Sequence, residues 1–198
     1  MKIKGVFIGT FTIAGYAPTC SIGFQYMKET TESLFTGSGN SYANIPTAEL
    51  TKEQYLCANT CNGSSSARFE IVQLDDDSYY IRSVEPDFYA GNILSLSNGY
   101  LYAYPPGHKS LDSFKFNVGG QSIDLCSTNT NIINDIEITC IDGGLELHKK
   151  NALSTNTREW AAYLVSRDGS DGLIGHKFTL SVIGQGQIYP GMESSFNL

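Results

Sequence analysis

With 198 residues, of which 41% are hydrophobic and 17% charged, the chain suits one globular domain, residues 1–198, with a core of its own. The formal net charge is −7, and the cations form no cluster of the kind that a nucleic-acid backbone requires, so nucleic acid is not an expected partner. No apolar run approaches the roughly 18 residues of a membrane-spanning helix, so no transmembrane segment is expected.

The first seventeen residues fit two interpretations. A basic start at Lys2 and Lys4, an apolar middle and small residues near Ala17 have the outline of a secretory signal peptide. The same stretch, interrupted by Thr10 and Thr12, also fits a first β-strand. Localisation stays open for this reason: a signal favours an extracellular protein, and a strand favours a cytoplasmic one.

Residues 28–49 are the least regular stretch, and residues 36–41 have turn chemistry with little to bury. We therefore expect a loop over residues 36–41, between an N-terminal section, residues 1–50, and a main body, residues 51–198. Pro46 and Thr47 are start signals for a short helix over residues 47–56. Residues 157–165 fit a helix or a strand equally well.

From residue 68 onward, short alternating segments are separated by turns, which is typical of an all-β protein. The clearest turn is Asn98-Gly99, because Asn-Gly is the strongest short hairpin signal. The predicted hairpin strands are 69–74 with 79–84, 93–96 with 100–104, 114–118 with 122–126, and 135–141 with 145–148, and a last strand is predicted over 178–183.

These segments suggest three units of about 44 residues, which open at Leu56, Leu101 and Leu145. The unit contains the pieces Phe69-Glu-Ile71, Tyr80-Ile-Arg-Ser83, Leu94-Ser-Leu96 and Gly99-Tyr-Leu-Tyr-Ala103. This pattern resembles the fascin-like, lectin-like repeats of the β-trefoil superfamily over residues 55–165. The resemblance implies a β-trefoil-like fold with an N-terminal extension, used as a scaffold for binding sugars, proteases or other proteins. An antiparallel β-sandwich is the alternative architecture.

The five cysteines are an odd number, so at least one lacks a partner within the chain. Two disulfides are conceivable, Cys126–Cys140 across a hairpin and Cys57–Cys61 around one turn. Buried thiols that pair with nothing explain Cys20 and the other cysteines equally well. No zinc-ligand spacing occurs, so we expect no metal site and no cofactor.

No motif indicates catalysis. The three histidines, His108, His148 and His176, stand in no recognisable nucleophile signature, and Gly-x-Ser-x-Gly does not occur. Acidic groups such as residues 75–77 are typical of solvated turns, although two carboxylates held close together would be required in a glycosidase. We therefore predict no catalytic residues and keep a hydrolase only as a third hypothesis.

One strand carries the candidate binding site. Tyr100, Tyr102 and Tyr104 share a face, while Leu101 and Ala103 face the core. Exposed, these rings beside Asn98 would suit a carbohydrate or protein ligand. The alternative is that they pack beneath residues 79–80 or 88–89 as a secondary core. The leading hypothesis is thus a non-enzymatic, lectin-like recognition module, and the second is a secreted structural or virulence protein that assembles through its strands. The oligomeric state is not predicted.

Overall fold

The computed structural model describes residues 1–17, 19–36, 42–87, 89–108, 111–141, 143–167, 176–196 and 198. Within these residues the chain forms thirteen strands and one short helix, so the all-β prediction is confirmed. The elements are β1 (Ile3–Ile13), β2 (Cys20–Phe35), β3 (Tyr42–Asn59), β4 (Arg68–Leu74), β5 (Tyr79–Ser83), β6 (Ile93–Ser97), β7 (Tyr100–Tyr104), β8 (Lys115–Val118), β9 (Gln121–Ser122), β10 (Ile132–Cys140), β11 (Gly143–Ala152), β12 (Trp160–Arg167), β13 (Lys177–Gln185) and α1 (Met192–Ser195).

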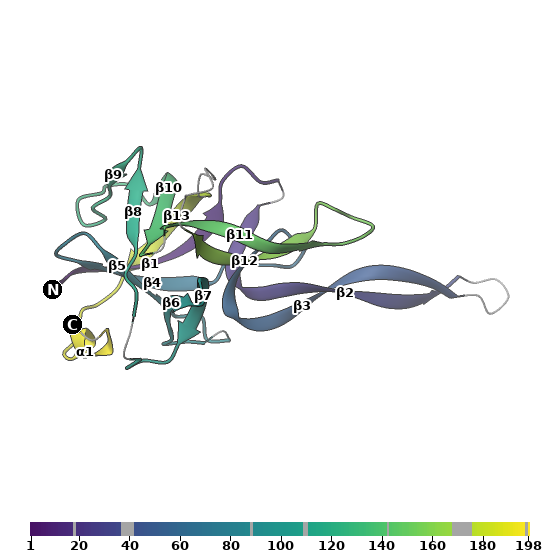
Figure 1. Cartoon of the computed structure of the whole chain (residues 1–198), viewed down its shortest axis with the longest axis horizontal. Helices are drawn as coiled ribbons and strands as arrows, with labels where there is room; N and C mark the ends of the chain where they lie inside the picture. Colours follow the sequence, from purple (N-terminus) through teal and green to yellow (C-terminus); the bar gives the residue numbers. More distant parts are fainter. Residues whose placement is uncertain are drawn as a thin grey trace.

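Ten of these strands form a closed antiparallel barrel. Their order is β11-β12-β3-β7-β6-β5-β4-β1-β13-β10, and the ring closes where β10 pairs with β11 at Cys140↔Gly143. The strands β2, β8 and β9 lie outside the ring (Figure 1). The predicted β-trefoil is therefore wrong, and so is the β-sandwich alternative, because one sheet curls round and joins itself.

The first strand of the N-terminal section is part of the barrel and not of an extension to it. β1 lies between β4 and β13, with Phe7 opposite Ile71 and Phe11 opposite Leu180. Residues 3–13 are thus a strand in the structure, which was one of the two interpretations of the first seventeen residues. The apparent repeat has no structural counterpart, since Leu56 lies near the end of the 18-residue strand β3 whereas Leu101 lies near the start of the 5-residue strand β7.

Aromatic rings fill the barrel. Phe11 contacts Phe69 and Phe116 at 5.9 Å between ring centroids, and Tyr79 stacks on Phe116 at 4.2 Å. About eight strands make an interior that ordinary side chains fill, so a ring of ten strands needs larger ones. The void left among Phe11, Phe178 and their neighbours is only about 10 Å³, which is too small for a ligand.

The strands β2 and β3 form a long hairpin that projects from the barrel (Figure 1). We call its outer part, residues 28–35 and 42–49, the arm; it pairs from Lys28↔Glu49 to Phe35↔Tyr42. The irregular stretch 28–49 is therefore mostly strand, and the predicted helix over 47–56 is wrong. Of the predicted loop over residues 36–41, residues 37–41 lie outside the described residues. The β-branched Thr30 and Thr47 face each other, with 3.1 Å between their hydroxyl oxygens, and such pairs stabilise strands.

The observed short hairpins agree better with the sequence-based predictions than the long β2–β3 hairpin does. β4 pairs with β5, and β6 pairs with β7 around Asn98 (φ 51°) and Gly99 (φ 81°), as a type I′ turn requires. The strand β13 is confirmed, and residues 157–165 contribute to β12 and not to a helix. β9 is shorter than predicted, and Asp142 of the predicted β10–β11 turn lies outside the described residues.

The C-terminal segment covers part of the outer barrel wall. Met192 and Phe196 are buried with Val72 and Tyr80, and the Phe196 ring stacks on Tyr80 at 5.1 Å. In the described residues no helix is long and apolar enough to cross a membrane.

Replacing Phe116 with alanine should lower the free energy of unfolding by about 3–5 kcal/mol, because the ring is fully buried at the barrel centre. The matched control is Phe35→Ala on the arm, where the ring is 58% exposed and the change should cost within about 0.5 kcal/mol. Urea unfolding followed by circular dichroism measures both. Equal losses for the two variants would contradict a barrel stabilised by its aromatic interior.

Candidate ligand-binding surface

The side chains of β7 divide between the two sides of the barrel wall. Leu101 and Ala103 point into the core and are 1% and 0% exposed, whereas Tyr100, Tyr102 and Tyr104 point outward and are half-buried. The predicted division of faces is confirmed. It follows from the two-residue period of a strand whose inner face must be apolar.

Neighbouring strands add more tyrosines to the same outer wall. Tyr55 of β3 lies directly opposite Tyr102, and Tyr163 of β12 lies opposite Cys57 on the other side of β3. Tyr26 of β2 stacks on Tyr163 at 4.5 Å. We call the whole set the tyrosine surface; it comprises Tyr26, Tyr55, Tyr100, Tyr102, Tyr104 and Tyr163. Tyr26, Tyr55 and Tyr163 were not predicted from the sequence, because only the strand order brings them beside β7.

The rings hold one another in place. Tyr55 makes edge-to-face contacts with Tyr100, Tyr102 and Tyr163 at centroid distances of 5.6, 5.1 and 5.9 Å. At the far end of the surface, Tyr104 stacks on His108 at 4.1 Å. Each such pair contributes about 0.5–1.5 kcal/mol beyond the area that it buries. The surface is therefore ordered before any ligand arrives.

Residues 79–80 do not cover Tyr100, Tyr102 and Tyr104, so this part of the secondary-core alternative is wrong. Tyr79 lies inside the barrel, and Tyr80 packs against Phe196. The ring of Tyr89 packs on Phe24 at 5.4 Å, with the Lys52 ammonium 4.7 Å from its centroid, and Phe88 lies outside the described residues. The tyrosines of β7 remain partly accessible to solvent.

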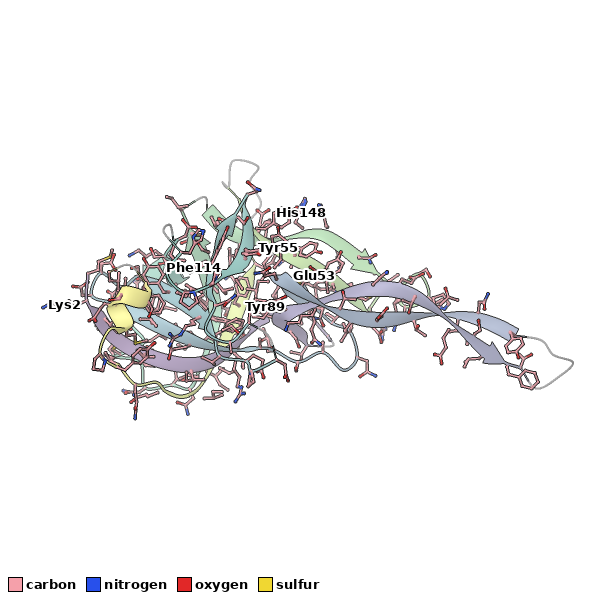
Figure 2. The ribbon with its side chains drawn as sticks, turned by 90° about the horizontal axis from the view of Figure 1, so that it is seen from below. Lys2, Glu53, Tyr55, Tyr89, Phe114 and His148 are labelled. Carbon is pink, nitrogen blue, oxygen red and sulfur yellow. The ribbon has the colours of Figure 1, made fainter. Side chains whose placement is uncertain are left out.

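A hollow of about 200 Å³ opens in the tyrosine surface. Its lining is Tyr55, Tyr100 and Tyr163, together with Lys149 of β11. The Lys149 ammonium lies 5.7 Å from the centroid of the Tyr100 ring, and the His148 ring meets the same tyrosine at 5.6 Å. Figure 2 shows Tyr55 and His148 close together where the arm leaves the barrel, with Glu53 nearby. The hollow thus combines apolar ring faces with hydroxyl groups and one cation.

Burial keeps the phenol groups of Tyr26, Tyr102 and Tyr163 neutral at ordinary pH. Burial, followed by the nearby Glu53 carboxylate, raises the pKa of Tyr163 to about 12. Burial is also the largest cause of the raised pKa of Tyr26 and of Tyr102. These hydroxyls can therefore donate and accept hydrogen bonds, as recognition of a polar ligand requires.

Two other hollows are larger but less suited to a specific ligand. One, of about 310 Å³, is bordered by residues 128–131 and 182–185, and the other, of about 420 Å³, by residues 60–64 with Thr19, Ser21 and Glu159. Neither brings several aromatic rings together. Ligand sites are usually concave, rich in aromatic groups and fixed by a few polar ones, which describes the hollow at Tyr55 better.

Asn98 occupies the hairpin turn beside Tyr100, and its positive φ accounts for an asparagine there. Its role in ligand binding stays a prediction. Of the histidines, His108 and His148 lie against the tyrosine surface, while burial lowers the pKa of His176.

The predicted disulfides are absent, since no bond joins any two of the five cysteines, all of which are described. The Sγ of Cys57 lies 3.4 Å from the Tyr55 carbonyl oxygen, and that of Cys61 lies 3.7 Å from the carbonyl oxygen of Trp160. Cys126 lies beside Asp124, whereas Cys140 contacts Ser113. Burial raises the pKa of the Cys61 thiol to about 11 and that of Cys20 to about 12, so both stay protonated and unreactive.

One pair of carboxylates does approach closely, at Asp77 and Asp124. Both accept hydrogen bonds from Lys4 Nζ, at 3.1 and 2.9 Å, and both accept from Gln73 Nε2. These donors, Lys4 foremost, lower the pKa of Asp124 to about 2. The lowered pKa of Asp124 is opposite to the raised pKa that a glycosidase acid needs, and the hydrogen bonds from Lys4 and Gln73 join the two carboxylates in an ion cluster.

The stability of the protein should fall between pH 10 and 12, partly through Tyr163. Its folded pKa of about 12 exceeds the unfolded value of 10.0, so its contribution is complete below pH 10 and is lost as the pH rises through 12. Replacing it with phenylalanine should flatten this part of the pH profile. Urea unfolding of both proteins across that range measures the difference, and identical slopes would contradict the assignment.

Comparison with family models, with curated proteins and with solved structures finds no match for this chain. No relative therefore supplies a function or a set of site residues for this chain. In the part of the chain that the structure describes, the tyrosine surface with its hollow is the arrangement best suited to binding.

Proposed function

We propose that the protein is a non-enzymatic, lectin-like recognition module that binds carbohydrate on the tyrosine surface. One observation carries the proposal: six outward, half-buried tyrosines from β2, β3, β7 and β12 pack together, and three of them line a hollow. A phenol ring offers an apolar face together with a hydroxyl, and a sugar ring offers C–H faces and hydroxyls in return.

The dimensions of the hollow favour a saccharide over a larger ligand. Sites for drug-sized molecules occupy about 300–1,000 Å³, whereas this one measures about 200 Å³ and is open to solvent. It therefore suits one ring of a longer chain, with the neighbouring rings of Tyr102 and Tyr104 available to further residues. Tyrosine is also enriched at protein interfaces, so a protein ligand is the alternative occupant of the same surface.

The binding of free sugars or of a glycan array should depend on Tyr102. Tyr102→Ala should weaken binding at least about tenfold, the effect of losing 1.4 kcal/mol, because the ring and its contacts with Tyr55 and Tyr104 disappear. The matched control is Tyr42→Ala, since this residue is 67% exposed and belongs to the last pair at the outer end of the arm. Unchanged binding by the Tyr102 variant would show that carbohydrate does not bind on the tyrosine surface.

A second candidate function is assembly of a structural protein through its strands, and the arm favours it. Residues 28–35 and 42–49 pair only with each other among the described strands, so both outer edges of this ribbon offer backbone groups to a further strand. Two-stranded hairpins are marginally stable alone. The arm also exposes large apolar side chains at its outer end, namely Leu34, Phe35, Tyr42 and Ile45. We propose a second copy of this chain as the partner.

If the arm mediates assembly, size-exclusion chromatography with light scattering should show an oligomer that the double variant Phe35→Ser, Tyr42→Ser converts to monomer. The two rings contact each other at 5.6 Å and form one exposed patch. Val118→Ser, an exposed apolar position on β8, is the control and should leave the oligomer intact. A monomeric wild-type protein at high concentration would exclude this candidate.

A further inference from the structure

Lys149 stands at an irregularity of the barrel. β11 pairs regularly with β12 up to His148↔Tyr163 and resumes at Asn151↔Ala161, so the register shifts between them. Within this bulge Lys149 has φ 50°, in the left-handed region that costs a residue with a side chain. Bulges often redirect a side chain next to a functional site.

The tyrosine surface itself holds this conformation. The Tyr26 hydroxyl donates a hydrogen bond of 2.8 Å to the Lys149 carbonyl oxygen, and the Tyr26 ring stacks on Tyr163. The same backbone that departs from the regular register thus places the Lys149 ammonium at the wall of the hollow, over the Tyr100 ring.

The charge of Lys149 is available to a ligand. Among the described residues the ion pairs engage Lys4, Arg68, Arg82 and Lys115, and no carboxylate pairs with Lys149, whose side chain is exposed. The next residue, Lys150, is directed elsewhere, with its ammonium 4.2 Å from the Trp160 ring centroid. The net charge of −7 repels anions in general, so an anionic group would bind here through local contact and not through long-range attraction.

Resting on the function proposed above, we propose that the hollow binds an acidic saccharide, a sugar residue that carries a carboxylate. The carboxylate accepts hydrogen bonds from the Lys149 ammonium, and the ring lies against Tyr55 and Tyr100. Glu53 of β3 lies close enough to Tyr163 for its negative charge to raise the pKa of that phenol. It therefore repels the carboxylate from that side and fixes the orientation of the sugar.

The test compares uronic-acid oligosaccharides with neutral oligosaccharides of the same linkage by isothermal titration calorimetry. The wild-type protein should bind the acidic series about tenfold or more tightly, and added salt should reduce that preference. Lys149→Met keeps most of the aliphatic stem and removes the charge, so the ratio of the affinities for the acidic and the neutral series should fall to about one. Lys150→Met is the matched control and should retain the preference.

A second variant separates ligand recognition from a purely structural role. Lys149→Gly should raise the midpoint of thermal unfolding, because glycine adopts φ 50° without strain, and should still lose the preference for acidic sugars. Equal affinity of the wild type for the two series, or an acid preference that survives Lys149→Met, overturns this inference and leaves the proposed function standing. Absence of binding to either series overturns both.

Discussion

The closure of β10 on β11 and the aromatic rings inside the resulting barrel constrain the rest of the molecule. Because the sheet joins itself at Cys140↔Gly143, each strand of the ring has one face turned to a shared interior. Phe11 contacts both Phe69 and Phe116, and the void beside Phe11 is only about 10 Å³. Among the described residues this void is too small for a ligand, and the candidate binding surface lies on the outer wall.

The outer wall is unusual where β3 enters the ring. β3 pairs with β12 and β7 only through its last residues, while its first part runs out into the arm with β2. Tyr55 stands at this transition, and the tyrosine surface is arranged around it. The bulge at Lys149 borders the same place. The candidate binding site therefore lies where β3 leaves the ring to enter the arm and where the β11–β12 register shifts.

The base of the arm is tied to this surface. The Asn151 side-chain amide donates to the Met27 carbonyl oxygen, and Ser154 donates to the Glu29 carboxylate. The Tyr26 hydroxyl donates to the Lys149 carbonyl oxygen in the bulge. The outer part of the arm pairs with no other described strand and exposes apolar side chains at its end, which is why it suggests a partner. Recognition on the wall and assembly through the arm use different residues, so the two candidate functions are compatible.

The sequence by itself determined the local features: the all-β class, the hairpin at Asn98-Gly99, and the inward Leu101 and Ala103 against the outward tyrosines of β7. These depend on turn chemistry and a period of two, both of which lie within a few residues. Only the tertiary structure decided the strand order, the closed ring, the arm with its mostly polar faces, and the arrival of Tyr26, Tyr55 and Tyr163 beside β7. Alternation states which side of a strand faces inward, but it carries no information on which strand becomes its neighbour, because backbone hydrogen bonds are the same for every pair.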